Sequence, residues 1–249
     1  MLEEIKPRII TYLYSGGKDS SLALLLTRDR VREYADKHNV NVYILYIAIP
    51  GNTHPLNAFC SAKVMYWHKK HYGFQPVFMA RDKVFQAYMA KYGLQKGSRR
   101  WCYTEFKWKV LKRYHQGIAL FYPALYVDGM DPRDSKHREQ IISSEFQHLR
   151  TGIGEYWVWH PLYSWKGDKM KALREHEEFR CVAKLYEKYG DSLNCVVCPY
   201  KNRSKLIKYH FQDNEALDII YDFMSETMRS RQHLKNHRPP DGDILGMIN

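Results

Sequence analysis

The stretch YLYSGGKDSSLALLL, residues 12–26, places a tight Gly-Gly-Lys turn between two apolar runs. The run before the turn belongs to residues 8–14 (RIITYLY), which are short and rich in β-formers. The segment after it, from Ser20 to about His38, has the length and composition of a helix. A strand, a glycine-rich turn and a helix in this order present backbone N–H groups and the positive helix end to an anion. The stretch therefore predicts a phosphate-binding loop.

Three residues of the turn suit this role, because Gly16 and Gly17 let the backbone approach a ligand and Lys18 can reach a phosphate as a point charge. The loop is not a Walker A motif. That motif needs Ser or Thr after Gly-Lys, where this chain has Asp19, and another glycine five positions before Gly17, where it has Tyr12.

A simpler interpretation is a glycine turn in which Ser15 or Ser20 caps the helix. Such a cap would account for the glycines. It would not account for Lys18-Asp19 between them, so we favour a phosphate loop.

The rest of the chain alternates between strands and helices. A buried strand is predicted at 41–49, further strands at 75–80 and 124–129, and helices at 56–71, 82–91 and 103–115. This order predicts an α/β fold with a doubly wound, mostly parallel sheet. Residues 166–189 are expected to form one charged helix, and 201–236 a largely helical basic region. We place a soft boundary near 160, which gives an α/β domain at 1–160 and a C-terminal helical, cysteine-containing appendage at 161–249 that packs on it.

Composition limits the cellular setting and the partners. The formal charge is +12, which favours a polyanionic partner, although a solvated basic face is the alternative. No run reaches the roughly 18 apolar residues of a membrane span, and the start, Met-Leu-Glu-Glu, is acidic where a signal peptide is basic. We therefore expect a cytoplasmic protein without a membrane partner. Five scattered cysteines predict no disulfide framework.

The motifs, taken together, resemble those of the PP-loop ATP pyrophosphatase superfamily, in its phosphoadenosine phosphosulfate reductase-like branch. The resemblance covers roughly residues 8–200, in the family's order. It rests on SGGKDS (15–20), NTH (52–54), RRWCYTEFKWKVL (99–111), VDGMDPRDSKHRE (127–139), HPLYSW (160–165) and NCVVCPY (194–200).

The resemblance implies an adenine nucleotide alpha hydrolase-like fold and an enzyme that cleaves ATP between the α and β phosphates, adenylating a substrate. It implies catalytic roles for Lys18 and Asp19, with Asp19 orienting the loop or a Mg²⁺ ion. The ATP-binding residues that it implies are Ser15, Gly16, Gly17, Lys18, Asp19, Ser20, Thr53 and Gly129.

One departure from this branch concerns the nucleophile. Sulfonucleotide reductases of the branch use a cysteine on a C-terminal tail, and residues 199–249 contain none. We therefore expect the protein to resemble the enzymes that put sulfur into nucleic acid, by DNA phosphorothioation or tRNA thiolation, with a cysteine desulfurase or other sulfur donor as partner. A sulfonucleotide reductase is the alternative, and a non-catalytic nucleotide-sensing or nucleic-acid-binding module is a third class. A homodimer is among the states left open.

The thiols of Cys102, Cys195 and Cys198 are predicted to hold a four-iron iron–sulfur cluster. Two cysteines separated by two residues can chelate one metal centre, and the resemblance places Cys102 near them. Cys181 is either a fourth ligand or a helix-packing residue. The competitors are a zinc site completed by a histidine such as His210 and a merely buried thiol pair.

Two basic segments could hold a nucleic-acid backbone beside the ATP site. Their charged residues are Arg99, Arg100, Lys107, Lys109, Lys112 and Arg113 in the first, and Lys201, Arg203, Lys205 and Lys208 in the second. Aromatic neighbours that could contact bases are Trp108, Tyr200 and Tyr209.

Overall fold

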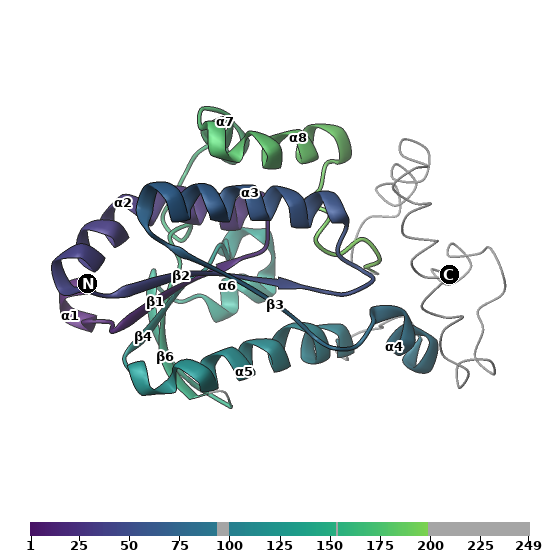
Figure 1. Ribbon diagram of the computed structural model, residues 1–249, viewed down its shortest axis with the longest axis horizontal. Coiled ribbons are helices and arrows are strands. Elements are labelled where there is room, and N and C mark those ends of the chain that lie inside the picture. Colours follow the sequence, from purple (N-terminus) through teal and green to yellow (C-terminus); the bar gives the residue numbers. More distant parts are fainter. Residues whose placement is uncertain (94–99, 153, 199–249) are drawn as a thin grey trace.

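A six-stranded sheet forms the centre of the protein (Figure 1). The computed structural model describes residues 1–93, 100–152 and 154–198. The strands are β1 (Ile9–Tyr14), β2 (Asn41–Ala48), β3 (Gln75–Ala80), β4 (Ala124–Val127), β5 (Phe146–Thr151) and β6 (Gly154–Trp159), in the order β3-β2-β1-β4-β6-β5. Strand β5 pairs antiparallel with β6, and the other four pairings are parallel. The predicted α/β class with a mostly parallel sheet is confirmed.

Helices cover both faces of this sheet. They are α1 (Leu2–Ile5), α2 (Lys18–His38), α3 (Pro55–Tyr72), α4 (Phe85–Tyr92), α5 (Lys109–Ile118), α6 (Lys136–Ile141), α7 (Lys169–Arg174) and α8 (Arg180–Tyr189). A π-helical segment, Tyr103–Trp108, leads directly into α5, and short 3-10 turns occupy Ala119–Phe121, Pro132–Asp134 and Glu177–Phe179. Helices α2 and α3 lie on one face, where α7 and α8 form a further layer outside them, and α5 lies on the opposite face (Figure 1).

Strand β1 lies between β2 and β4, and five of its six residues are buried. A strand covered on both faces needs apolar side chains throughout, which is why this segment has no alternating polar pattern. Its carboxyl end leads directly into the Gly-Gly turn and α2, as predicted. From β1 the chain adds β2 and β3 on one side of the sheet and then crosses to add β4 on the other side. Open α/β sheets bind ligands at the carboxyl edge of the strands next to such a change of side.

Aromatic side chains at the β5–β6 edge serve packing. Trp159 is 3% exposed and stacks on Phe146 at 4.9 Å between ring centroids, and Trp157 stacks on His148 at 4.7 Å. Trp157 and Trp159 alternate along the strand, a pattern that favours packing over a base-stacking platform, and these contacts agree with packing.

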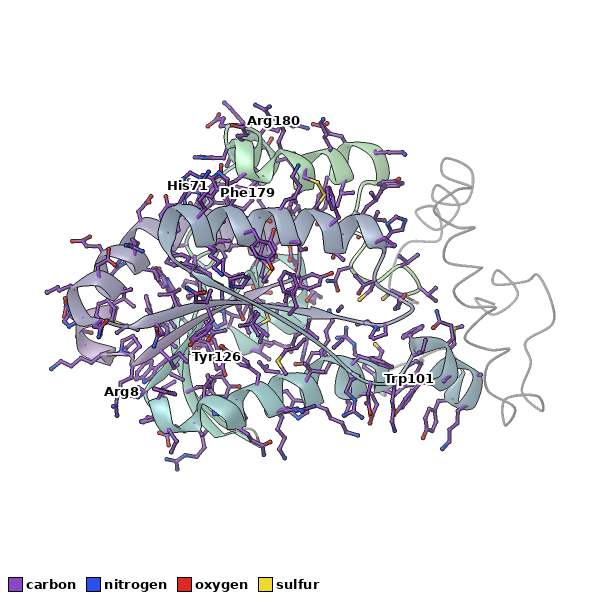
Figure 2. The ribbon with its side chains drawn as sticks, viewed as in Figure 1. Arg8, His71, Trp101, Tyr126, Phe179 and Arg180 are labelled. Atoms are coloured by element: carbon purple, nitrogen blue, oxygen red, sulfur yellow. A yellow bond between two sulfur atoms is a disulfide. The ribbon has the colours of Figure 1, made fainter. Side chains whose placement is uncertain are left out.

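The expectation of one helix over residues 166–189 is wrong. Helix α7 ends at Arg174, a 3-10 turn follows, and α8 begins at Arg180. The break turns Phe179 into the core, where it is fully buried between the α7–α8 layer and α3 (Figure 2). Burial of a large apolar side chain contributes about 1.5–3 kcal/mol, which helps to offset the interruption of the helix.

The segment from 161 to 198 packs on the α/β core as expected, since Leu173, Phe179 and Val182 share one cluster with residues of β1 and α2. The boundary near 160 itself stays a prediction, and the helical region predicted over 201–236 lies outside the described residues. Within the described ranges, the structure contains no helix both long enough and apolar enough to cross a membrane.

Candidate active site

The predicted phosphate loop connects the end of β1 to the start of α2. Gly16 has a φ of +70°, in the left-handed region. A Cβ atom on it would lie 2.2 Å from the Ser61 Oγ and 2.6 Å from the Asn57 Nδ2, both on α3. Conformation and close approach therefore both require glycine here.

The two serines of the motif shape the loop. The Ser20 hydroxyl accepts a hydrogen bond from the Ser15 N–H at 3.2 Å and donates one to the Gly17 carbonyl at 3.1 Å. The capping interpretation is wrong, because the N-cap of α2 is Gly17 and no side chain caps the helix; Ser20 instead closes the turn. The side chains of Lys18 and Asp19 take no part in this closure and lie in the first turn of α2.

Gly129 follows β4 and lies directly against the first turn of α2. A Cβ on Gly129 would lie 2.5 Å from the Asp19 carbonyl carbon and from the Ser20 backbone nitrogen. Only a residue without a side chain allows β4 to bring its following loop this close to the phosphate loop. The structure therefore brings together the two motifs that the sequence placed 110 positions apart.

A chain of alternating charges surrounds Asp19. The Lys18 Nζ lies 2.9 Å from the Asp19 Oδ2, and the Lys169 Nζ lies 2.5 Å from the Asp19 Oδ1 and 2.7 Å from the Asp131 Oδ2. Arg133 in turn donates to both oxygens of Asp131 at 2.8 Å. Neither Lys169 nor Asp131 was predicted from the sequence to be a site residue. Asp131 lies within the motif at 127–139, whereas nothing in the sequence distinguishes Lys169 from the other charged residues of 166–189.

The protonation of these partners follows from their contacts. Burial alone would raise the pKa of Asp131, but hydrogen bonds from Arg133 and Lys169 outweigh it and hold that pKa well below its usual value. Burial would likewise lower the pKa of Lys169, and hydrogen bonds to Asp131 and Asp19 raise it instead. Asp131 is thus ionised and Lys169 protonated at neutral pH.

Tyr186 of α8 covers the start of α2. The backbone N–H of Lys18 donates to the Tyr186 hydroxyl oxygen at 3.1 Å, and burial raises the pKa of this phenol to about 12. A cavity of about 420 Å³ opens beside this contact, lined by Lys18, Met170, Arg174, Tyr186, Glu187, Gly190 and Asp191. The backbone N–H of Lys18 has no partner within α2 and could bind an anion, but it donates instead to a phenol at the rim of the cavity.

Residues 52–54 (NTH) hold the loop at 194–198, which carries Cys195 and Cys198. The Asn52 side chain accepts from the Val197 N–H at 2.7 Å and donates to the Val197 carbonyl at 3.0 Å, and the Thr53 hydroxyl donates to the Asn194 carbonyl at 2.9 Å. Asn194 reaches back to the phosphate loop, where its Nδ2 donates to the Ser15 carbonyl at 2.8 Å. Thr53 therefore positions this loop, and its role in binding ATP stays a prediction.

The three predicted metal ligands lie in one region, but they do not assemble a site. Cys102 and Cys195 pack in the same apolar cluster, around Phe106 and Val197, and the Cys195 thiol lies 3.5 Å from the Asn194 Oδ1. Among the residues that the structure describes, no three His, Cys, Asp or Glu side chains gather closely enough to hold a metal ion. These residues therefore show no closed iron–sulfur or zinc site, and metal binding by Cys102, Cys195 and Cys198 stays a prediction. His210 lies outside the described residues.

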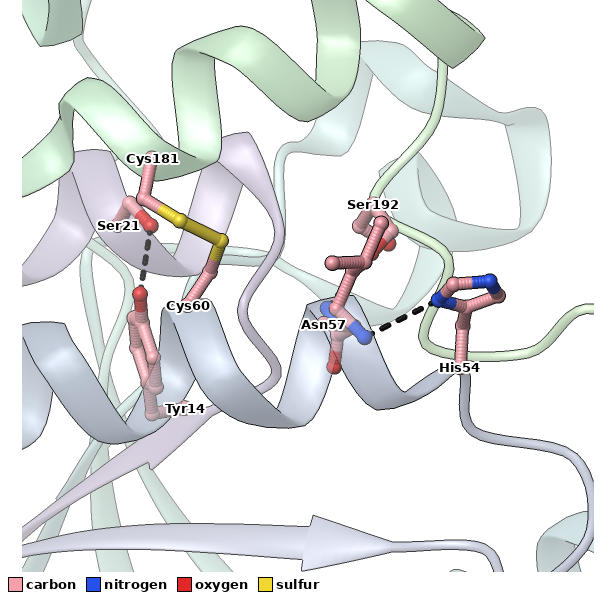
Figure 3. The surroundings of a disulfide bond; sticks show 8 residues. Tyr14, Ser21, His54, Asn57, Cys60, Cys181 and Ser192 are labelled. Atoms are coloured by element: carbon pink, nitrogen blue, oxygen red, sulfur yellow. Dashed lines mark hydrogen bonds between the residues drawn. A yellow bond between two sulfur atoms is a disulfide. The ribbon is translucent and has the colours of Figure 1, made fainter. Parts of the chain in front are cut away.

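Cys60 and Cys181 form a disulfide between α3 and α8, with Cα atoms 5.5 Å apart (Figure 3). This corrects two expectations from the sequence: that the cysteines form no disulfide, and that Cys181 could be a fourth metal ligand. The two cysteines are 121 positions apart, and only the packing of α8 on α3 brings them together. The disulfide ties the helix that carries Tyr186 to the helix that carries Asn57.

Comparison with known proteins begins with sequence. No protein-family model matches the chain. The chain is 24% identical over 213 residues to an uncharacterized protein of Methanocaldococcus jannaschii, a match that covers 83% of this chain. It spans 39% of the length of that relative.

The solved structures to which the chain is similar include two of Candida glabrata FMN adenylyltransferase. One, with FAD and inorganic pyrophosphate bound, has a TM-score of 0.44 and 15% identity, covering 66% of this chain and 48% of that one. The other, with FMN and an ATP analogue, has a TM-score of 0.41 and 16% identity, covering 65% and 46%. Phosphoadenylyl-sulfate reductase from Candida auris has a TM-score of 0.40 and 11% identity, covering 68% and 72%.

Proposed function

We propose that this protein is an ATP pyrophosphatase that cleaves ATP to AMP and pyrophosphate, adenylating an oxygen of a nucleic acid so that sulfur can displace it. The proposal is carried by one observation: Lys18 and the N-terminal amides of α2 follow the central strand β1 at the carboxyl edge of the sheet, with the Gly129 loop packed against them.

The charge at this site suits departure of pyrophosphate. The leaving group gains negative charge as the bond between the α and β phosphates breaks, and cations and N–H groups already in place stabilise that charge without rearrangement. Lys18 supplies the cation, and the first turn of α2 supplies the N–H groups.

Mg²⁺ would enter this site with the triphosphate and neutralise part of its charge. Such an ion needs only one or two carboxylates from the protein, because water and phosphate oxygens complete its coordination. Asp19 fits this requirement, since its carboxylate is on the same turn as Lys18 and is 23% exposed.

A nucleic-acid acceptor is supported by the basic segment that precedes and forms α5. The Lys107 Nζ lies 3.5 Å from the Asn194 Oδ1, and Asn194 in turn contacts Ser15 of the phosphate loop. Lys107 of this segment is thus linked to the phosphate loop through a single intermediate residue, Asn194. Exposed Lys112 and Arg113 continue it along α5, and the second predicted basic segment, 201–208, lies outside the described residues. DNA phosphorothioation or tRNA thiolation is the reaction we propose, with sulfur from a cysteine desulfurase or another donor.

The first experiment measures pyrophosphate and AMP formation by the purified protein with Mg·ATP, alone and with duplex DNA or unmodified tRNA. We expect one pyrophosphate for each ATP cleaved, with the label from α-phosphate-labelled ATP divided between the adenylated nucleic acid and the AMP released when water or sulfur displaces it. Release of ADP and phosphate would contradict the proposal. Reduction of phosphoadenosine phosphosulfate with thioredoxin, without ATP cleavage, would instead favour the alternative of a sulfonucleotide reductase.

The second experiment tests the acceptor surface by the salt dependence of nucleic-acid binding. Each phosphate contact contributes a slope of about 0.7–0.9 in a plot of log affinity against log salt concentration. We expect the double variant Lys112→Gln, Arg113→Gln to lower this slope. Lys69→Gln, Lys70→Gln is the matched control, because it removes the same charge from exposed positions on α3. Binding that is absent, or insensitive to salt, would leave the basic charge as a solvated face.

A further inference from the structure

Lys169 and Lys18 both contact Asp19, but they are held very differently. Lys18 approaches one carboxylate oxygen, and Lys169 approaches the other. Within the described ranges, the ion pairs of Lys18 are confined to Asp19, and its ammonium lies 5.7 Å from the centre of the Tyr186 ring. The Lys18 side chain is 31% exposed, and it borders the cavity beside Tyr186.

Lys169, by contrast, is fixed between two carboxylates. It bridges Asp19 and Asp131, with Asp134 at 3.8 Å, and its side chain is 15% exposed. Asp131 is itself held by Arg133 and is 2% exposed. The ammonium of Lys169 therefore has several anionic partners within the protein, which makes it a poor candidate to move toward a ligand.

The backbone around Lys169 is fixed as well. The Asp168 carboxylate caps α7 by accepting from the N–H groups of Met170 and Lys171 at 2.9 and 3.0 Å. One turn later, the fully buried Leu173 anchors the helix in the main core. Cap and anchor together hold the Lys169 ammonium over Asp19.

A polyphosphate bound at the loop would draw the Lys18 ammonium away from Asp19. As long as no Mg²⁺ ion and no second lysine lies on Asp19, its carboxylate would then face the phosphates alone and repel them. A cation that stays on the other oxygen of Asp19 removes much of this repulsion, and it leaves Lys18 less tightly bound to Asp19 at the start.

We propose that Lys169 is a positioning residue for the phosphate loop: it remains on Asp19 and neutralises it while Lys18 transfers to the β and γ phosphates. This inference rests on the proposed function, since it assigns a role within the same site. It accounts for a half-buried lysine that no motif of the sequence singled out.

The test is binding of inorganic pyrophosphate by titration calorimetry, in EDTA so that no metal ion bridges Asp19 to the ligand. We expect Lys169→Met to weaken binding by about tenfold, an effect typical of a close charge pair. Lys169→Arg, which keeps the charge, should bind within about threefold of the wild type. Lys171→Met is the matched control, since it removes the same charge from an exposed position of α7 and should bind normally.

The double variant Asp19→Asn, Lys169→Met separates positioning from a purely structural role. If Lys169 acts by neutralising Asp19, removing the Asp19 charge should restore most of the affinity lost in Lys169→Met. If Lys169 only fastens α7 to Asp131, the double variant will bind as weakly as Lys169→Met, and the inference is overturned. Unchanged affinity in Lys169→Met overturns it too. A wild-type protein that binds neither pyrophosphate nor Mg·ATP would instead refute the proposed function itself.

Discussion

The backbone N–H of Lys18 donates a hydrogen bond to the phenol oxygen of Tyr186, 168 positions later in the chain. The amide belongs to the first turn of α2, where an anionic ligand of the phosphate loop would bind. The phenol thus competes with the ligand for this donor. Its helix, α8, is tied to α3 by the Cys60–Cys181 disulfide.

Tyr186→Phe removes this competition. We expect pyrophosphate affinity to rise about two- to tenfold, the range of one net hydrogen bond, as measured by titration calorimetry. Tyr163→Phe is the control, because it loses a hydrogen bond of the same 3.1 Å length, to the Ser143 carbonyl, away from the loop. Weaker binding by Tyr186→Phe would mean that the phenol contacts the ligand.

Lys18→Ala and Asp19→Ala test the proposed chemistry. Both side chains point away from the core, so the fold should be retained. We expect pyrophosphate formation from Mg·ATP to fall by about 10²–10³-fold, as when one group that stabilises transition-state charge is removed. The measurement is a coupled pyrophosphate assay, with circular dichroism to check folding. Near-normal cleavage by Lys18→Ala would refute the mechanism.

Gly129→Ala tests the close approach of β4 to the phosphate loop. Its Cβ would meet the backbone of Asp19 and Ser20, which cannot rotate away as a side chain can. We expect the loop to shift and pyrophosphate formation to be lost. Gly117→Ala is the control, since a Cβ there would meet nothing within 4 Å, and it should be fully active. Normal activity in Gly129→Ala would show that the loop tolerates displacement.

The pH dependence of stability has one predictable source in His68. Burial lowers the pKa of His68 to about 4, against 6.5 in the unfolded chain. The unfolded state therefore binds the proton more readily, and stability falls as the pH drops from about 7 to 4, by about 3 kcal/mol. Urea unfolding at several pH values should show this slope in the wild type and a smaller one in His68→Gln. An equal slope in both would assign it to other groups.

The disulfide can be tested by alkylation under non-reducing, denaturing conditions followed by mass spectrometry. Cys102, Cys195 and Cys198 are not in disulfides, so three adducts are expected, and five after reduction. Cross-linking residues 121 positions apart restricts the unfolded chain, so Cys60→Ala should lower the free energy of unfolding by about 2–4 kcal/mol. Five adducts without reduction would contradict the pairing.

Much of the fold and part of the site could be predicted from the sequence. Strands β1 to β4 lie where the sequence predicts strands, and in β1, β2 and β4 the reason is that a largely buried parallel strand is encoded by its own apolar residues. Gly16 and Gly129, which the motifs include, lie where a Cβ atom would clash with neighbouring residues, and their role in binding ATP stays a prediction. The hydrogen bonds that close the loop join residues within five positions, so they depend on local sequence.

Only the tertiary structure decided what surrounds this loop. Lys169 lies 150 positions from Asp19 and Tyr186 lies 168 positions from Lys18, and both contacts arise because α7 and α8 pack outside α2 and α3. The break between α7 and α8 depends on burying Phe179, and the Cys60–Cys181 pair depends on the packing of α8 against α3. Local pattern encodes the strand, the turn and the helix, whereas charge pairing across layers depends on which helices meet. Which helices pack against each other is decided by the burial of their apolar side chains in the folded core.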